Sequence, residues 1–562
     1  PFILNSTKYL YMKKSFFLPF LAFLITLNCL NAQQVAPENW FTTDIMESGV
    51  PGTRVDKAYK ELLKGQQPKP VIVAVIDSGV EADHEDLKDR MWVNPKEKPG
   101  NNIDDDKNGY ADDINGWNFI GGKDGRNIKQ DSYEATREYV RLKAKFDGAD
   151  PAKISRKDQK DYNEYVKLKE DIDKKRESAA NNLNQIEMTV TMLSAPLQSV
   201  KEALGRKKAT KENIDAIDAG DDQNLNMGKM IMAQILGSGE FPTQNMDSII
   251  LLVESELNEG IKHYKNQIDY SYNTEFDPRT DIVRDNYSDY TEKSYGNNDV
   301  EGPEASHGTH VAGIIGANRN NNLGIRGIAD QALIMSLRAV PDGDERDKDI
   351  ANSIIYAVDN GAKVINMSFG KGYSPGKKYV DAAVKYAAKK DVLLVHAAGN
   401  SSANNDTEPN FPNARFEKKG LFGKKFADNW IEVGALSWRP GEDMVAGFSN
   451  YGAKNVDLFA PGVDLYSTVP NQSYKKESGT SMAAPVVAGV AVLLRSYFPT
   501  LSAKQTKEII LQSVHKVNAM VKKPGTDELV PFSSLSVTGG YVDAYEAIKL
   551  AAKKTGVKLA MP

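Results

Sequence analysis

The sequence predicts an α/β domain in which a parallel sheet is covered by helices on both faces, together with an α-helical insertion. Residues 71–76 form a continuous apolar run rich in β-branched side chains, typical of a strand buried on both faces of a parallel sheet. Similar runs follow at 363–367, 392–396 and 431–435, with helical patterns between them at 350–360 and 379–389. Strands that alternate with helices indicate right-handed crossovers and helices on both faces of the sheet.

Residues 131–295 differ from the rest of the chain in composition and are rich in Lys, Glu, Asp and Gln. Apolar residues recur there at helical spacing, at Tyr139, Leu142, Phe146 and again at Tyr165, Leu168, Ile172. The pattern predicts a small bundle or helical hairpin with its charged faces in solvent. The predicted organisation is a signal peptide at 1–32, a first part of the α/β domain at 33–130, the insertion at 131–295 and a second part at 296–562.

Composition restricts the class of protein. The 562 residues are 40% hydrophobic and 26% charged, which fits a globular chain and excludes both global disorder and a protein with many membrane spans. The net charge of −5 argues against a nucleic-acid partner, which would require a basic excess. The single cysteine excludes a framework of internal disulfides.

The N-terminal residues have the order of a secretory signal. Two lysines follow Met12, which we take as the start, and residues 16–27 form a short apolar run that precedes a small residue, Ala32. This basic, apolar, small order predicts a signal peptide, and the run is too short to cross a bilayer comfortably. We therefore expect residues 1–32 to direct export, and we expect no membrane span.

Cys29 lies at the end of the apolar run, where a lipoprotein cysteine can lie. However, Asn28 precedes it in a place where small residues are usual. If cleavage follows Ala32 instead, the mature chain contains no cysteine. A lipid anchor at Cys29 and release without an anchor are both open, so the predicted location is secreted, periplasmic or at the cell surface.

Asp77 begins the first of three short motifs whose side chains could take part in a reaction. Asp77-Ser78-Gly79 follows the 71–76 strand directly. An acid at the carboxyl end of a central parallel strand lies where open α/β sheets place their functional sites. An aspartate at a strand end is also a common helix cap, so this motif alone leaves both interpretations open.

His307 belongs to the second motif, His307-Gly308-Thr309-His310, which opens a helix of small apolar residues. Two histidines three residues apart can bind zinc, but the H-E-x-x-H pattern and nearby cysteines are missing. The dipole of a helix N-terminus lowers the pKa of a histidine there unless an acid compensates. That placement suits a general base held by a carboxylate.

Ser481 lies in the third motif, which runs from Gly479 to Pro485 and opens a second helix of small residues. The backbone amides at the start of that helix point toward any group that the Ser481 oxygen attacks. An oxyanion formed there would be stabilised by these donors.

The three motifs occur in the order Asp77, His307, Ser481, which is the triad order of subtilisin. On these residues the chain resembles the subtilisin-like (S8) serine peptidases over about 40–120 and 301–548. The resemblance implies a subtilisin-like three-layer α/β sandwich with a central parallel sheet, and endopeptidase chemistry. An α/β-hydrolase esterase does not fit, because G-x-S-x-G is missing and the order differs.

The resemblance also implies the roles of individual residues. Ser481 would be the nucleophile, and His307 would take its proton and return it to the leaving amine. Asp77 would orient His307 and stabilise its protonated form. Asn400 matches the family's oxyanion-hole asparagine, whose side-chain amide joins the backbone N–H of Ser481.

Two segments match the family's substrate-binding strands. Ser368, Phe369 and Gly370 resemble the strand whose edge pairs with the substrate backbone. With Ala397, Ala398 and Gly399 they would clamp an extended peptide by strand addition. Phe369 replaces a residue that is often a smaller aliphatic one, so we expect a narrowed or reshaped subsite.

An acidic loop predicts a calcium site. Asp104, Asp106 and Asn108, followed by Gly109, satisfy the first half of an EF-hand loop. Position twelve is Asn115 rather than glutamate, so the loop is not an EF-hand. Asp112 and Asp113 would close the cage instead, and the alternative is a solvated acidic turn.

A second calcium site is implied by family position alone. Asp86 matches a ligand that pairs with the loop interrupting the helix after the catalytic histidine. Here that loop is 318–325, where Asn320 offers a side-chain amide and carbonyl.

The sequence therefore predicts an exported serine endopeptidase that acts on polypeptides and binds structural calcium. The alternative is a catalytically silent protein of the same fold that uses the helical insertion as its contact surface, but all four catalytic positions are intact. Because the insertion enters between Asp77 and His307, we hypothesise that it governs substrate access or partner docking.

Overall fold

The computed structural model describes residues 36–238, 243–417 and 423–560, which form two compact units. The α/β unit comprises Ala36–Ile172 and Asp269–Pro562, and the helical unit comprises Asp173–Ile268. The predicted signal peptide and Cys29 lie outside the described residues.

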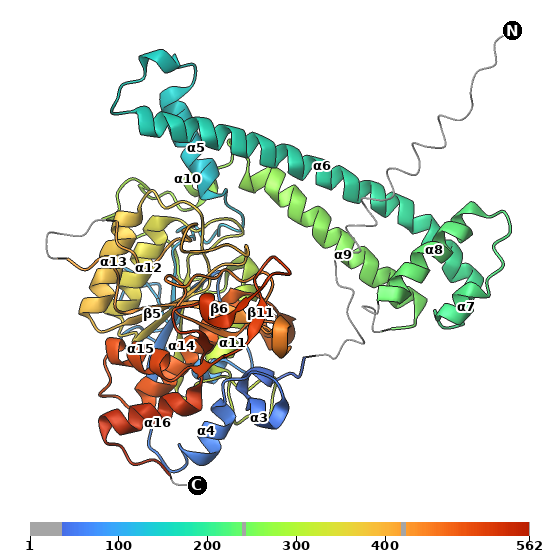
Figure 1. The fold of residues 1–562 in the computed structure, drawn as a ribbon. Coiled ribbons are helices and arrows are strands. Elements are labelled where there is room, and N and C mark those ends of the chain that lie inside the picture. The colour runs from blue at the N-terminus through green and yellow to red at the C-terminus, as the bar shows by residue number, and fades with distance from the viewer. Residues whose placement is uncertain (1–35, 239–242, 418–422, 561–562) are drawn as a thin grey trace. The chain divides into compact units, whose positions relative to one another are not determined.

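A central sheet runs through the α/β unit (Figure 1). Among the described residues it has nine strands in the order β10-β13-β7-β6-β5-β4-β1-β3-β2, and every neighbouring pair is parallel except β10 and β13. In chain order the strands are β1 (Val71–Asp77), β2 (Gly116–Asn118), β3 (Ala332–Arg338), β4 (Val364–Met367), β5 (Leu393–Ala397), β6 (Trp430–Leu436), β7 (Leu458–Pro461), β10 (His515–Lys516) and β13 (Gly540–Tyr541). The apolar runs of the sequence are thus strands of one parallel sheet, which confirms the predicted fold class.

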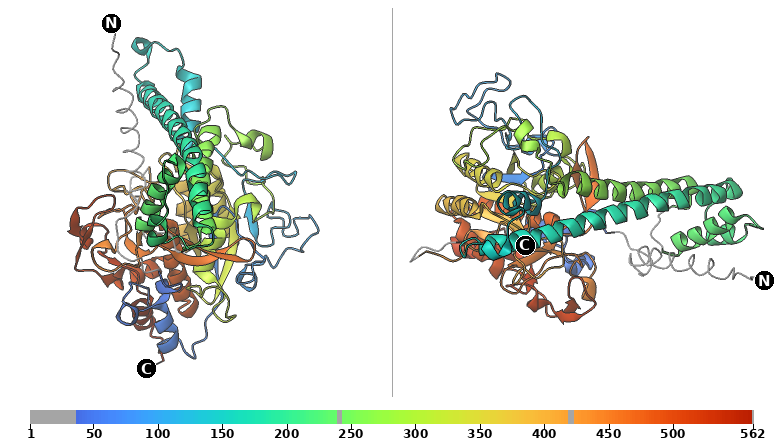
Figure 2. Two further views of the ribbon diagram at one scale, coloured as in Figure 1. Left: turned by 90° about the vertical axis from the view of Figure 1, so that its right-hand side faces the viewer. Right: turned by 90° about the horizontal axis from the view of Figure 1, so that it is seen from above.

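Helices cover both faces of this sheet (Figures 1 and 2). Successive side chains of β1 alternate between two buried clusters, with Val73 and Val75 in one and Ala74 and Ile76 in the other. Each cluster is completed by helices of one face. The first contains side chains of α11 (Ser306–Gly316), α14 (Thr480–Tyr497), α4 (Val55–Glu61), α15 (Ala503–Gln512) and α16 (Ala544–Thr555), and the second contains those of α12 (Asp347–Asp359) and α13 (Lys377–Lys389).

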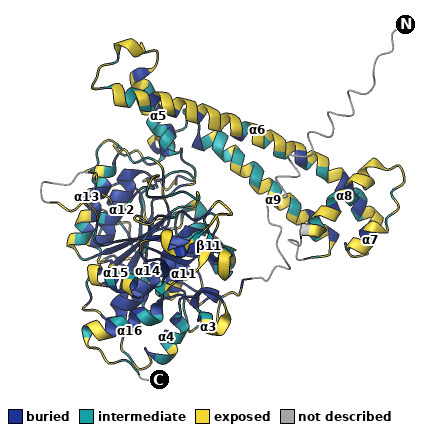
Figure 3. Ribbon diagram, in the orientation of Figure 1, coloured by how far each residue is buried: buried dark blue, intermediate teal, exposed yellow. Residues whose placement is uncertain are grey.

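Helix α14 passes through the core of the α/β unit, where Figure 3 shows it almost entirely buried. Its small side chains, among them Ala483 and Ala484, let it pack closely against the sheet. Within the described ranges it is also the one helix long and apolar enough to cross a bilayer, but 89% of that stretch is buried inside the structure.

Shorter elements complete the α/β unit. The described ones are η1 (Trp40–Thr42), α3 (Ile45–Ser48), η2 (Lys88–Arg90), α5 (Glu134–Phe146), η3 (Pro151–Lys153), α10 (Pro278–Ile282), η5 (Gly302–Glu304), η6 (Gly441–Asp443), η7 (Phe532–Ser534), the hairpin β8 (Leu465–Val469) with β9 (Ser473–Glu477), and the hairpin β11 (Met520–Lys522) with β12 (Leu529–Pro531). The β8–β9 hairpin packs on α11 at Gly313, where a Cβ would lie 2.3 Å from the hydroxyls of Ser467 and Thr468. Those hydroxyls donate instead to backbone carbonyls of α11.

The helical unit is built from antiparallel helices. α6 (Gln159–Leu204) begins in the α/β unit and continues into the helical unit, followed by α7 (Lys211–Asp215), α8 (Gln223–Ser238) and α9 (Met246–Asn266). Ion pairs of 2.5 Å between Lys201 and Asp247 and of 3.5 Å between Glu187 and Lys265 join α6 to α9 in antiparallel register. A short π-helical segment, η4 (Gln267–Ser271), follows α9.

The compact helical unit is shorter than the insertion predicted at 131–295. The apolar residues at helical spacing in that region do form the buried faces of two helices. Tyr139, Leu142 and Phe146 of α5 pack against Tyr165, Leu168 and Ile172 of α6. Residues 131–172 and 269–295 nevertheless belong to the α/β unit.

Candidate active site

Asp77 and His307 form a close pair at the carboxyl edge of the sheet. Asp77 is the last residue of β1, and His307 is in the first turn of α11. His307 Nδ1 lies 2.7 Å from Asp77 Oδ1. The aspartate side chain is 2% exposed and the imidazole is 37% exposed, so one partner is fixed in the interior and the other faces the surface.

Two glycines allow this approach. Gly79 has a φ of +128°, and a Cβ there would lie 2.0 Å from the carbonyl oxygen of Glu301. A Cβ on Gly308 would lie 2.1 Å from the carbonyl oxygen of Gly79. The glycines of both motifs are therefore required for the turn after Asp77 to touch the start of α11.

The electrostatic environment favours the charged form of His307. Burial of the imidazole opposes protonation, but the negative charge of Asp77 and its hydrogen bond outweigh burial and raise the pKa of His307. With Asp77 as acceptor, Nδ1 carries the proton and Nε2 is free to act as a base.

Ser481 is the second residue of α14, where backbone N–H groups have no helical acceptor. Its Oγ donates to the carbonyl oxygen of Ser368 at 3.1 Å, and Ser368 Oγ donates to the carbonyl oxygen of Ser481 at 2.8 Å. Pro485 has no N–H to offer that Ser481 carbonyl, so Ser368 replaces the missing helical bond. Across the described ranges no hydrogen bond joins Ser481 Oγ to His307, because the hydroxyl donates to Ser368 instead.

Ser481 and Asp77 belong to the same edge of the sheet. β4 lies beside β1 with Met367 opposite Ile76, so Ser368 and Asp77 leave the sheet at the same level. Because Ser368 is bonded twice to Ser481, the structure brings the three motif regions to one edge.

Asn400 follows β5 after Ala398 and Gly399 and is exposed. Its side-chain carbonyl accepts hydrogen bonds from the backbone N–H and the hydroxyl of Thr480, both at 2.9 Å. This leaves the amide nitrogen directed away from Thr480, and a Cβ on Gly479 would lie 3.4 Å from it. The Asn400 amide and the Ser481 N–H are therefore both available at the start of α14.

The two predicted substrate segments lie at the carboxyl ends of neighbouring parallel strands, β4 and β5, and Ala397 is the last residue of β5. Ser368, Phe369, Ala397 and Ala398 are buried, whereas Gly370 is exposed and Gly399 is half-buried. Phe369 is 9% exposed, and its ring makes an edge contact with that of His396 at 6.2 Å between centroids.

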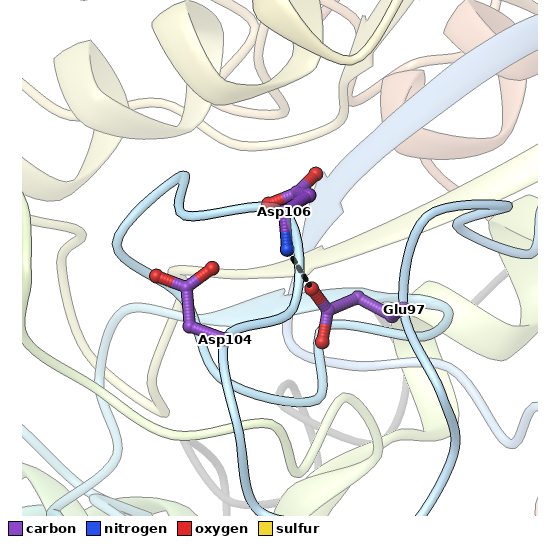
Figure 4. Close-up of side chains that lie close together, drawn as sticks. All are labelled: Glu97, Asp104 and Asp106. Atoms are coloured by element: carbon purple, nitrogen blue, oxygen red, sulfur yellow. Dashed lines mark hydrogen bonds between the residues drawn. The ribbon is translucent and has the colours of Figure 1, made fainter.

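The acidic loop brings Asp104 and Asp106 together with Glu97, which was not among the predicted ligands (Figure 4). One carboxylate oxygen from each lies within 4.8 Å of the others. Glu97 accepts from the backbone N–H groups of Asp106 and Asp112, both at 3.1 Å. Glu97 precedes the loop and is not a position of any ligand-spacing pattern, so nothing in the sequence marks it as a ligand.

Every predicted carboxylate of this loop accepts hydrogen bonds from the protein: Asp104 from the backbone N–H groups of Asn108 and Gly109, and Asp106 from that of Asn108. The oxygens of Asp112 accept from the backbone N–H groups of Gly100 and Asn102. Those of Asp113 accept from three side chains, Asn94, Asn108 and Tyr356. Burial raises the pKa of Asp113 to about 6.

Asp86 contacts the loop expected from family position. Its carboxylate accepts from the backbone N–H of Asn318 at 3.2 Å, from that of Ile325 at 3.3 Å, and from the amide of Asn321 at 2.8 Å. Asn320 is exposed, and its backbone N–H donates to Asn318 Oδ1. The Asp86 carboxylate is thus bonded to one asparagine amide and two backbone N–H groups, and burial raises its pKa.

Comparison with known proteins gives a consistent result. The sequence profile of the Subtilase family matches residues 69–532. The thermophilic serine proteinase of Bacillus sp. (strain AK1) is 44% identical over 192 residues, 34% of this chain and 43% of the relative. Thermitase of Thermoactinomyces vulgaris is 41% identical over 34% of this chain and 61% of its own. Subtilisin DY of Bacillus licheniformis is 37% identical over 36% of this chain and 67% of its own.

The chain thus spans about half the length of the first two relatives. The profile match, however, covers most of the chain and includes Asp77, His307 and Ser481. With the parallel sheet and the close Asp77–His307 pair, it means that the chain belongs to the Subtilase family.

Proposed function

We propose that this protein is an exported serine endopeptidase that hydrolyses peptide bonds in polypeptides. The observation that carries the proposal is the 2.7 Å contact between Asp77 and His307, at the sheet edge where Ser481 begins α14. The family membership supports the same activity. Support for export comes from the basic and apolar N-terminal residues.

The geometry supports a two-step reaction. Ser481 Oγ attacks the substrate carbonyl carbon while His307 Nε2 takes the hydroxyl proton, and Asp77 stabilises the resulting imidazolium. His307 then protonates the leaving amine, the C–N bond breaks, and an ester between substrate and Ser481 remains. Water attacks this ester by the same route, with His307 again as the base, and releases the acid and free Ser481.

The negative charge on the substrate oxygen would be stabilised by the Ser481 N–H and the Asn400 amide. Thr480 supports this assignment, because its two bonds to the Asn400 carbonyl fix which end of the side chain faces the reacting carbon. A preorganised donor is worth more here than in water, since it needs no reorganisation during the reaction.

The segments Ser368–Phe369–Gly370 and Ala397–Ala398–Gly399 would clamp an extended peptide. Asn410, Asn405 and Asn450 all donate to the carbonyl of Ala398, at 3.2, 2.9 and 2.9 Å. That carbonyl is fully occupied, and the backbone N–H groups of Ala398 and Gly399 donate to the Val433 carbonyl and the Thr480 hydroxyl. These bonds hold the second segment in place.

Glu97, Asp104 and Asp106 would hold a structural calcium ion. Three carboxylates within 4.8 Å of one another are hard oxygen ligands, the donor type that calcium prefers. Lys96 Nζ, 3.8 Å from Asp106, offsets only part of their charge. A bound cation would neutralise the loop and stabilise the fold by binding only the native state.

The proposal is tested by labelling with a fluorophosphonate, which reacts only with an activated serine. Wild type, Ser481→Ala and a matched Ser401→Ala variant would be labelled with calcium or with EDTA. We expect labelling of wild type and Ser401→Ala but not of Ser481→Ala. Failure of folded, calcium-loaded wild type to react would overturn the endopeptidase assignment in favour of a silent binding protein.

A further inference from the structure

The residue after the first substrate segment is a buried lysine. Lys371 follows Gly370, and its side chain is 1% exposed. Its Nζ lies 2.7 Å from Glu134 Oε2 and 3.0 Å from Asp347 Oδ1. It also donates to the carbonyl of Glu345 at 2.7 Å. All three hydrogens of the ammonium therefore have partners, which is the condition for burying this charge.

The partner Glu134 is the first residue of α5, close to the start of the predicted insertion. Its side chain is 3% exposed, and it is also paired with Arg137 at 2.8 Å. Its backbone N–H donates to Asp344 at 2.8 Å. Burial disfavours the Glu134 carboxylate, but Arg137 and Lys371 outweigh burial and lower its pKa. Glu134 and Lys371 are therefore both charged, and the Glu134 carboxylate is paired with Lys371 and with Arg137.

Lys371 is joined to the second substrate segment through its backbone. Lys371 and Phe411 exchange two hydrogen bonds of 2.9 Å. Asn410, the preceding residue, donates to the carbonyls of Ala397 and Ala398 at 3.3 and 3.2 Å. The same asparagine lies against Gly370, where a Cβ would meet its side chain at 2.6 Å. Displacement of Lys371 would thus be transmitted to both segments.

A second contact joins the same loop to the helices. Tyr373 packs against the apolar cluster that contains Tyr139 of α5 and Tyr165 of α6. The loop after the first substrate segment is therefore held by an ion pair at Lys371 and by packing two residues later. Both contacts come from residues 131–172, which join the α/β unit to the helical unit through α6.

We propose that the Lys371–Glu134 ion pair positions the Gly370 end of the substrate-binding segment Ser368–Phe369–Gly370, so that α5 acts on peptide affinity. Ser368, at the other end of the segment, stays fixed by its two hydrogen bonds to the reacting serine. This inference rests on the proposed function. Neither residue touches the substrate; both are positioning residues. The pair makes extended peptide binding depend on α5, which lies within the predicted insertion.

The test compares Lys371→Met and Glu134→Gln with a matched control, Lys348→Met. Lys348 is also a buried lysine, and within the described ranges its ammonium bonds to Asp285 at 2.7 Å, to the carbonyl of Asn286 at 2.7 Å and to Glu292 at 2.9 Å, and not to the substrate segments. KM and kcat would be measured on a peptide long enough to fill several subsites and on a single-residue ester. Melting temperature and the fluorophosphonate labelling rate would be measured on each variant.

We expect Lys371→Met and Glu134→Gln to raise KM for the long peptide at least tenfold. Kinetics on the ester and the labelling rate should stay within about threefold of wild type, and Lys371→Arg should recover part of the peptide affinity. Unchanged peptide KM in a folded variant, or an equal rise in KM for Lys348→Met, would overturn the inference. Absence of labelling in wild type would instead overturn the proposed function.

Discussion

Replacing Asn400 by alanine separates transition-state stabilisation from fold stability. The substitution removes the amide donor and also the two 2.9 Å bonds to Thr480. Because Asn400 is exposed, water can replace the acceptor for Thr480, so each lost bond costs at most about 0.5–1.5 kcal/mol of folding stability. An oxyanion donor contributes about 2.7–4 kcal/mol, so kcat should fall about 10²–10³-fold.

The assay is kcat on a peptide substrate, with thermal denaturation of the same samples. Asn400→Asp is the matched control, because it keeps an oxygen acceptor for Thr480 but has no N–H to donate. It should retain the melting temperature of wild type and lose at least as much turnover as Asn400→Ala. Turnover of Asn400→Ala within threefold of wild type would refute the reasoning, as would recovery of kcat in Asn400→Asp.

Three further predictions concern the triad and the acidic loop. Neutral His307 is the base, so activity should rise as the pH passes through the raised pKa of His307. Asp77→Asn should move the midpoint of the pH–rate profile to lower pH and reduce kcat by about 10⁴-fold. An unmoved midpoint would contradict the role of Asp77. Calcium at a concentration of 100 times its Kd should stabilise wild type by about 2.7 kcal/mol, and Asp104→Asn should abolish this stabilisation in melting curves with and without EDTA. If EDTA still lowered the melting temperature of Asp104→Asn, calcium would not bind at this site. Gly308→Ala should abolish fluorophosphonate labelling, since its Cβ would meet Gly79 O at 2.1 Å, whereas Gly237→Ala, which meets nothing within 4 Å, should label normally.

The sequence by itself determined the elements that carry the proposed chemistry. The apolar run at 71–76 became β1, and the acid that ends it lies at the carboxyl edge of the sheet. His307 and Ser481 begin helices, as the small-residue patterns after them indicated. These features were predictable because side-chain alternation and helix N-termini are local properties of the chain.

Tertiary structure alone decided which side chains meet. Glu97 joins Asp104 and Asp106, while Asp112 accepts from the backbone at Gly100 and Asp113 from the amide of Asn94, although all five are acids in or beside one loop. Local spacing cannot tell such carboxylates apart, because their partners depend on how the loop closes.

The Lys371–Glu134 ion pair could not be predicted from local sequence either. The two residues are 237 positions apart, and neither belongs to a motif. The extent of the helical unit, Asp173–Ile268, was likewise decided by burial of α5 and the start of α6 within the α/β unit. Periodicity identifies a helix and its apolar face, but the surface that covers this face is supplied by residues distant in the chain, and only folding brings them together.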